Sequence, residues 1–165
     1  MLIGAVSDSH DNLPLIEQAI QTLNTQKVAL VLHAGDYISP FTIAKFKMLN
    51  CPLIGVFGNN DGDHELLKKR FSETENCTIH NRFIQITIEN LQIGLLHGDE
   101  TNLLNTLISC SHFDFVIHGH THQQSITHKN KTLIINPGEL CGYLTGIPTM
   151  ALIDTAKKEA SIIEL

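Results

Sequence analysis

In the first half of the chain, short apolar runs alternate with longer segments in which apolar residues recur at helical spacing. Residues 2–7 predict a buried strand, and the residues after Asp11 or Asn12, either of which can cap a helix, predict a helix to about Asn24. Its expected apolar face consists of Leu15, Ala19, Ile20 and Leu23. Further strands are expected at 28–32 and 52–57, and further helices at about 40–49 and 63–71. This order is typical of a parallel sheet covered by helices.

The second half of the chain is richer in strands. Three hairpins are expected, joining 83–88 to 91–96, 125–128 to 132–136, and 149–154 to 160–165. A helix at about 102–110 and a buried strand at 113–117 complete the pattern. Together, these strands and helices predict one α/β domain over residues 1–165, with two sheets packed face to face and helices outside.

Polar clusters follow the ends of five predicted strands, and most contain glycine, which lets the backbone approach a site closely. In open α/β sheets, ligands bind beyond the carboxyl ends of the strands, so clusters far apart in sequence can meet there. The five clusters are Asp8-Ser9-His10, Gly35-Asp36, Gly58-Asn59-Asn60-Asp61, His97-Gly98 and His118-Gly119-His120-Thr121-His122.

The residue types in these clusters fit a site for two metal ions. Asp8 alternates with His10, and His120 with His122, so each pair points the same way in an extended segment. With Asp36 as a bridge, two carboxylates, one amide and four imidazoles leave room for a bridging water that two metals would activate. A nitrogen and oxygen set without thiolate suits Mn, Fe, Zn, Ni or Co. The seven candidate ligands are Asp8, His10, Asp36, Asn59, His97, His120 and His122.

Each of these residues also has an ordinary alternative. Asp8 and Asp36 could cap helices, which is the commoner use of a single Asp at a strand end. Asn59 could be a turn residue and His97 a loop residue, and alternating histidines also occur in surface tracts. Capping and turns explain the set of seven much less well than metal binding does. Among the other histidines, His33 and His118 are expected in the core or orienting ligands, and His64, His80, His112 and His128 at the surface.

The motifs D-x-H, G-D, G-N-x-D, H-G and G-H-x-H, in this order, resemble the calcineurin-like metallophosphoesterase superfamily. The short length and Asn136-Pro137-Gly138 make the chain most similar to the small YfcE-type phosphodiesterases, over residues 3 to about 140. The resemblance implies a four-layer αββα sandwich with two mixed β-sheets. It also implies a phosphodiesterase that uses two divalent metal ions, with Mn as the expected ion, to activate a hydroxide that attacks phosphorus.

By the same resemblance, two groups of ligands share Asp36. The first metal would be bound by Asp8, His10, Asp36 and His122, and the second by Asp36, Asn59, His97 and His120. Asp61 is expected to orient a neighbour rather than to bind metal.

Two positions depart from the family pattern. Many relatives have His where this chain has Asn60, and asparagine can hydrogen-bond a phosphate oxygen but cannot act as a general acid. A preference for good leaving groups, such as aryl phosphodiesters, is therefore expected; His64 could substitute as the acid, although a surface position is the simpler reading. Glu139 stands where relatives often have Ser, and is expected either to repel phosphate or to face solvent.

Composition narrows the substrates and partners. Eleven Lys and Arg against seventeen Asp and Glu give a net charge of −6, whereas binding along a nucleic acid backbone needs a basic face. A small phosphoester is expected instead, because bound metals supply positive charge locally. No signal peptide or membrane span is visible, and four dispersed cysteines favour the cytoplasm. A homodimer is an expectation from the family alone.

Two other functions remain open from the sequence. A phosphomonoesterase or nucleotide hydrolase would use the same metals. An interaction scaffold is a rival from another class, because the small subunit of retromer resembles this family and has a degraded site. The complete set of seven ligands favours an enzyme.

Overall fold

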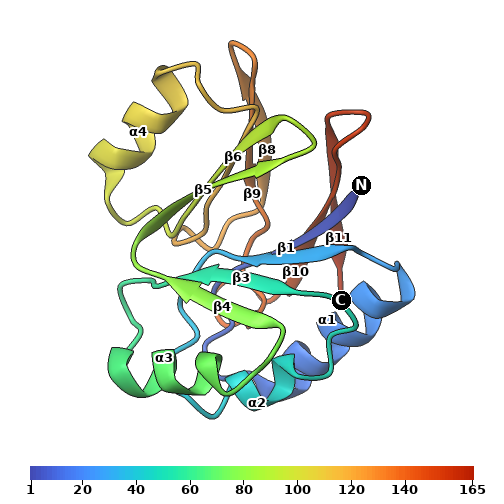
Figure 1. The fold of residues 1–165 in the computed structure, drawn as a ribbon, viewed down its shortest axis with the longest axis vertical. Helices are drawn as coiled ribbons and strands as arrows, with labels where there is room; N and C mark the ends of the chain where they lie inside the picture. The colour runs from blue at the N-terminus through green and yellow to red at the C-terminus, as the bar shows by residue number, and fades with distance from the viewer.

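The computed structural model describes residues 1–165 as two mixed β-sheets with helices outside them (Figure 1). In the first sheet the order is β11-β10-β1-β2-β3-β4. Strands β1 to β4 are parallel to one another, and β10 returns antiparallel to β1. The bounds are β1 Leu2–Val6, β2 Leu30–His33, β3 Leu53–Val56, β4 Cys77–His80, β10 Thr149–Asp154 and β11 Glu159–Glu164.

The second sheet has the order β5-β6-β7-β9-β8. Its three central strands are parallel, and each edge strand pairs antiparallel through a hairpin. The bounds are β5 Phe83–Ile88, β6 Leu91–Leu96, β7 Phe115–Ile117, β8 Ser125–Lys129 and β9 Thr132–Asn136. All three predicted hairpins are present.

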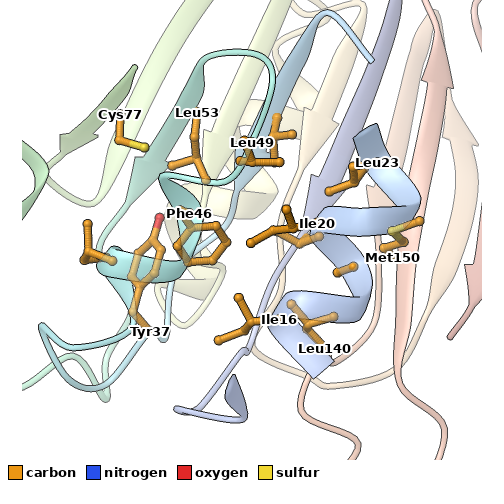
Figure 2. Close-up of a cluster of buried hydrophobic side chains, with 14 of the residues drawn as sticks. Ile16, Ile20, Leu23, Tyr37, Phe46, Leu49, Leu53, Cys77, Leu140 and Met150 are labelled. Carbon is orange, nitrogen blue, oxygen red and sulfur yellow. The ribbon is translucent and has the colours of Figure 1, made fainter. Parts of the chain in front are cut away.

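Three apolar clusters separate four layers, because each sheet buries both of its faces. One cluster packs helices α1 to α3 on the first sheet, and Figure 2 shows its side chains from α1, α2 and the strands beneath. A second, which includes Leu32 and Phe115, fills the space between the sheets. A third packs α4 on the second sheet. The helices are α1 Leu13–Thr25, α2 Ile43–Phe46, α3 His64–Ser72 and α4 Thr101–Ser109. The predicted four-layer fold is confirmed.

The start of α1 shows how local sequence sets an element. Asn12 caps the helix by accepting a hydrogen bond from the backbone of Leu15, and Pro14 lies in the first turn, where its missing N–H costs nothing. The buried face differs by one residue from the prediction, because Ile16 takes the place expected for Leu15. None of the four helices combines the length and apolar content needed to cross a membrane.

Two elements were predicted wrongly. Residues 40–49 form only the short helix α2, with turns on either side, because Pro40 and the Thr42 contact to Asp11 hold the preceding backbone in a turn. Strand β4 was not predicted: only Cys77 of its four residues is buried, and the strand forms the edge of the sheet, so it carries no apolar run.

Candidate metal centre

The seven candidate ligands lie at the carboxyl ends of central strands from both sheets. Asp8 and His10 follow β1, Asp36 follows β2 and Asn59 follows β3, all in the first sheet. From the second sheet, His97 follows β6, and His120 and His122 follow β7. The parallel arrangement of these strands brings the side chains to one edge of the sandwich.

One group of ligands surrounds Asp8. Its Oδ1 atom lies 3.5 Å from His122 Nε2 and 4.0 Å from His10 Nε2, and ligand atoms of these three residues lie within 4.8 Å of one another. Asp8 Oδ1 and His10 Nε2 are buried and have no hydrogen-bond partner. Unsatisfied buried polar atoms are rare and need an explanation, and a cation bound between them would supply one here. The residues present therefore fit a metal ion.

A second group surrounds Asp36. His97 Nε2 lies 3.3 Å from Asp36 Oδ2 and 3.0 Å from Asn59 Oδ1. The ring of His120 packs edge-on against the ring of His97, with centroids 5.2 Å apart. Asp36 Oδ2 is also 3.5 Å from His10 Nε2, so Asp36 contacts both groups. The structure thus brings all seven residues together and places Asp36 between the two halves.

The outer nitrogen of two histidines is held by a hydrogen-bond acceptor. His97 Nδ1 lies 2.8 Å from the Ala34 carbonyl, and His122 Nδ1 lies 2.7 Å from Glu139 Oε2. Since a carbonyl or carboxylate can only accept, each Nδ1 carries the proton and donates it. Each Nε2 then faces the carboxylates. Burial lowers the pKa of His97, but the hydrogen bond and charge of Asp36 outweigh it and raise that pKa, so without a metal ion the Nε2 proton is shared with Asp36. A bound metal would take the place of that proton at Nε2.

Glu139 corrects a prediction. It neither faces solvent nor points at the substrate space, because it is completely buried and its carboxylate contacts His122. Burial would raise the pKa of Glu139, but hydrogen bonds from His122, Thr145 and Leu144 outweigh it and lower the pKa to about 2. The carboxylate is therefore charged at neutral pH. Its role was missed because the contact spans 17 residues and only the position after Asn-Pro-Gly marked it.

Asp61 orients the Asp36 loop, as expected. Its carboxylate accepts hydrogen bonds from the backbone N–H groups of Asp36, Tyr37, Ile38 and Gly58. All four donors belong to loops that carry candidate ligands. Asp61 therefore holds two ligand loops against each other.

Asn60 contacts Asp36 with both its backbone and its side chain. The backbone N–H donates to Asp36 Oδ1 at 2.9 Å, and Nδ2 donates to Asp36 Oδ2 at 2.7 Å. His64, the alternative acid, stacks on Phe57 at the start of α3, with ring centroids 4.1 Å apart. Neither residue offers an acidic proton to a leaving group in this arrangement.

The two carboxylates differ in their electrostatics. Burial would raise the pKa of Asp36, but hydrogen bonds and the charge of His97, with the bonds from Asn60, outweigh it and hold the pKa well below its usual range. Burial dominates at Asp8 and raises its pKa, since His97 and His122 compensate only in part. Asp8 is thus the carboxylate whose charge most needs a cation beside it.

Five of the seven candidate ligands have left-handed backbone conformations. Non-glycine residues adopt such angles rarely and at some cost, and they cluster at functional sites. The φ angles are 52° for Asp8, 38° for His10, 60° for Asp36, 67° for His120 and 61° for His122.

Of the remaining histidines, His33 and His118 are buried, as predicted. His33 bridges Ser9 Oγ and the Gly35 N–H, both in loops that carry ligands. His80, His112 and His128 are exposed, whereas His64 is half-buried against Phe57 rather than at the surface.

Comparison with known proteins identifies the class. A sequence model of the calcineurin-like phosphoesterase superfamily domain matches residues 1–158, and the chain belongs to this superfamily. The predicted class, a metal-dependent phosphoesterase, is confirmed.

Among its relatives, the chain is 43% identical over 159 residues to a phosphodiesterase of Methanocaldococcus jannaschii, covering 96% of each protein. It matches the solved structure of an archaeal phosphodiesterase over 100% of both chains, with 42% identity and a TM-score of 0.95. The fold also matches zinc-bound Vps29 of Entamoeba histolytica, with 24% identity, a TM-score of 0.74, and coverage of 99% and 91%.

Proposed function

We propose that this chain is a phosphodiesterase that binds two divalent metal ions through the seven residues described above. The observation that carries the proposal is the pair of buried, unpartnered atoms, Asp8 Oδ1 and His10 Nε2, within a cluster of further ligand atoms. The phosphodiesterase of Methanocaldococcus jannaschii, 43% identical, supports the same activity.

The charge of the site favours diesters over monoesters. No Lys or Arg occurs in the site segments, which are residues 7–12, 33–39, 57–63, 97–100, 118–124 and 136–148. Arg82 does contact the loop after His97, but Asp99 and Glu100 both accept hydrogen bonds from it. Metal ions would therefore supply the free positive charge, and a diester, with one negative charge, suits this site better than a dianionic monoester or a nucleotide polyphosphate.

The residues have distinct roles in this proposal. Asp8, His10, Asp36 and His122 would hold one ion, and Asp36, Asn59, His97 and His120 the other. Bound there, the ions would supply an activated water and Lewis acidity toward the phosphoryl oxygens. The mixed nitrogen and oxygen donor set suits Mn, Fe, Zn, Ni or Co and is too rich in nitrogen for Mg or Ca. Among these ions, Mn is the one proposed, from the resemblance to the family.

The other residues of the site position these ligands. Asn60 holds the bridging carboxylate of Asp36 with two hydrogen bonds, and Glu139 and the Ala34 carbonyl orient two imidazoles. Asn60 and His64 are not arranged to protonate a leaving group, so the acidity of the substrate's own leaving group is important.

The natural substrate is inferred to be a small diester. A net charge of −6 disfavours a long nucleic acid, which is held by its phosphates. The complete ligand set supports an enzyme rather than an interaction scaffold on the same fold. All four cysteines are free, which favours a reducing compartment such as the cytoplasm.

The test compares bis(p-nitrophenyl) phosphate with p-nitrophenyl phosphate, using metal-stripped protein with and without Mn²⁺. We expect Mn²⁺-dependent turnover with kcat/KM at least about 100-fold higher for the diester, and a loss of about 10³-fold in Asp36→Asn. Asp154→Asn is the matched control, because Asp154 pairs with Leu2 at the start of β1, the end opposite the ligands, and asparagine can accept the same turn hydrogen bonds. Turnover without metal, or undiminished in Asp36→Asn, would refute the proposal.

A further inference from the structure

A pocket of about 140 Å³ adjoins the candidate metal centre and shares His122 with it. His122 Nε2 faces Asp8, while the same ring lines the pocket. The lining contains no carboxylate, Lys or Arg, and consists of His122, Gln123, Gln124, Thr145, Ile147 and Thr149. The pocket is therefore close to the metals but offers no charge partner to a second phosphate.

The loop between Cys141 and Pro148 forms one wall of this pocket and is unusually apolar at its surface. Tyr143 is 62% exposed, Leu144 74% and Ile147 46%. Three of the six large apolar residues that the chain exposes thus lie within five consecutive positions beside the site. Single exposed apolar residues need no explanation, but such a concentration marks an interaction site.

Hydrogen bonds tie this loop to the metal centre. Glu139 Oε1 accepts from the backbone of Leu144 at 2.9 Å and of Thr145 at 2.5 Å, while Oε2 accepts from His122. At the start of the loop, the Cys141 N–H donates to the Asp8 carbonyl at 3.1 Å, and Asn12 Nδ2 donates to the Cys141 carbonyl at 2.9 Å. The backbone of the loop that carries the exposed apolar side chains is therefore held in place before any ligand arrives, which lowers the entropic cost of binding.

We propose that this pocket and loop bind the ester group that stays on the phosphorus, and that this group is an uncharged ring. The inference rests on the proposed phosphodiesterase function and names its substrate class. With the phosphate at the metals, a ring would pack against Ile147, and the amides of Gln123 and Gln124 could each donate to and accept from its polar edge. Benzene-like rings and nucleobases belong to this class, whereas short alkyl groups and second phosphates do not.

The test uses three diesters that share the p-nitrophenolate leaving group and differ in the other ester group: methyl, phenyl and thymidine-5′-yl. The Mn²⁺-loaded proteins are the wild type, Ile147→Ala and Met48→Ala. Met48 is the matched control, because it is 47% exposed against 46% for Ile147 and lies beside Asn24 at the end of α1, remote from the strand ends that carry the ligands. Binding of diphenyl and dimethyl phosphate, measured by calorimetry, gives a readout that does not depend on turnover.

We expect Ile147→Ala to lower kcat/KM about fivefold to tenfold for the two ring esters, and less than about twofold for the methyl ester. Diphenyl phosphate should lose affinity in the same variant, and Met48→Ala should change neither. An equal effect on all three substrates, or none, would overturn the inference while leaving the diesterase intact. An unchanged substrate ratio with an altered oligomeric state would show that a second copy covers the loop, and would also overturn it.

If the wild type turned over none of the three esters, the proposed function would fail. Calorimetry would then test the inference separately. Tighter binding of diphenyl phosphate than of dimethyl phosphate, lost in Ile147→Ala, would support the ring-binding pocket. Equal binding of the two phosphates would contradict it.

Discussion

His122 Nδ1 lies 2.7 Å from Oε2 of Glu139, and this one carboxylate also holds the backbone of Leu144 and Thr145. A ligand of the candidate metal centre and a loop at its rim are thereby fixed to the same buried group. Neither can shift without breaking a charge-assisted hydrogen bond.

Replacing Glu139 should therefore weaken metal binding without touching a ligand. Glu139→Gln presents an amide donor to His122 and disfavours the tautomer with a free Nε2, so we expect Mn²⁺ affinity to fall about 10–100-fold by calorimetry. Glu139→Ala should also make the loop at 143–147 sensitive to limited proteolysis. Glu159→Gln, an exposed change on β11, is the control. Unchanged affinity in Glu139→Gln would show that the carboxylate supports only the loop.

Gly58 must lack a side chain for Asp36 to keep its position. A Cβ atom at Gly58 would lie 2.1 Å from Asp36 Oδ1, whereas one at Gly62 would meet only the Ile38 carbonyl, at 3.7 Å. We expect Gly58→Ala to lose about 1–3 kcal/mol of unfolding free energy and to bind metal poorly, as measured by urea denaturation and metal analysis. Gly62→Ala in the same turn should resemble the wild type; equal behaviour of the two variants would contradict this reading.

The Asn60 position should determine how rates depend on the leaving group. Since asparagine cannot donate an acidic proton, kcat/KM across a series of aryl and alkyl diesters should fall steeply as leaving-group pKa rises. Asn60→His should flatten this dependence, with a gain of about 10²-fold for the poorest leaving groups if the imidazole protonates them. A shallow slope in the wild type would mean that another group, or water, already supplies the proton.

His33 should make stability depend on pH. Its complete burial, together with the charge of His97, lowers its pKa from 6.5 to about 3. Because the folded pKa lies below the unfolded value, only the unfolded chain takes up this proton between those limits, and stability falls as pH falls below about 6.5.

Denaturation of metal-stripped protein at different pH values tests this effect of His33 on stability. Between pH 6 and pH 5 the wild type should lose about 1 kcal/mol more unfolding free energy than His33→Gln. His128→Gln, exposed on β8, should leave the wild-type slope as it is. A slope shared by His33→Gln and the wild type would mean that His33 charges in the folded state.

The sequence was most informative where function restricts it. Asp8, Asp36 and the alternating histidines could be placed at one edge from strand ends and glycines alone, and the hairpins followed from period-two patterns and turn residues. Strand β4 was missed because a short edge strand has one solvated side and carries no apolar run. Helix α2 was predicted too long because Asp11, distant in sequence, holds Thr42 and the turn before the helix.

The largest omission concerns Glu139. The residues next to Glu139 in the sequence do not reveal its hydrogen bond with His122, which lies 17 positions away. They also do not show that its carboxylate is buried, which requires several hydrogen-bond donors around it. A glutamate directly after Asn136-Pro137-Gly138 is an unusual feature of the sequence, but only the structure shows where its side chain points.

The division of the ligands between the sheets has a mechanical consequence. Under the proposed assignment, each metal would take ligands from both sheets, so the separation of its donors is set by the apolar layer that includes Leu32 and Phe115. Thinning or thickening that layer would change the span across which both ions must be coordinated. The selectivity of the site among ions of different radius then depends on the packing of the protein's interior. Substitutions in the apolar layer between the sheets, without contact to either ion, would change that selectivity.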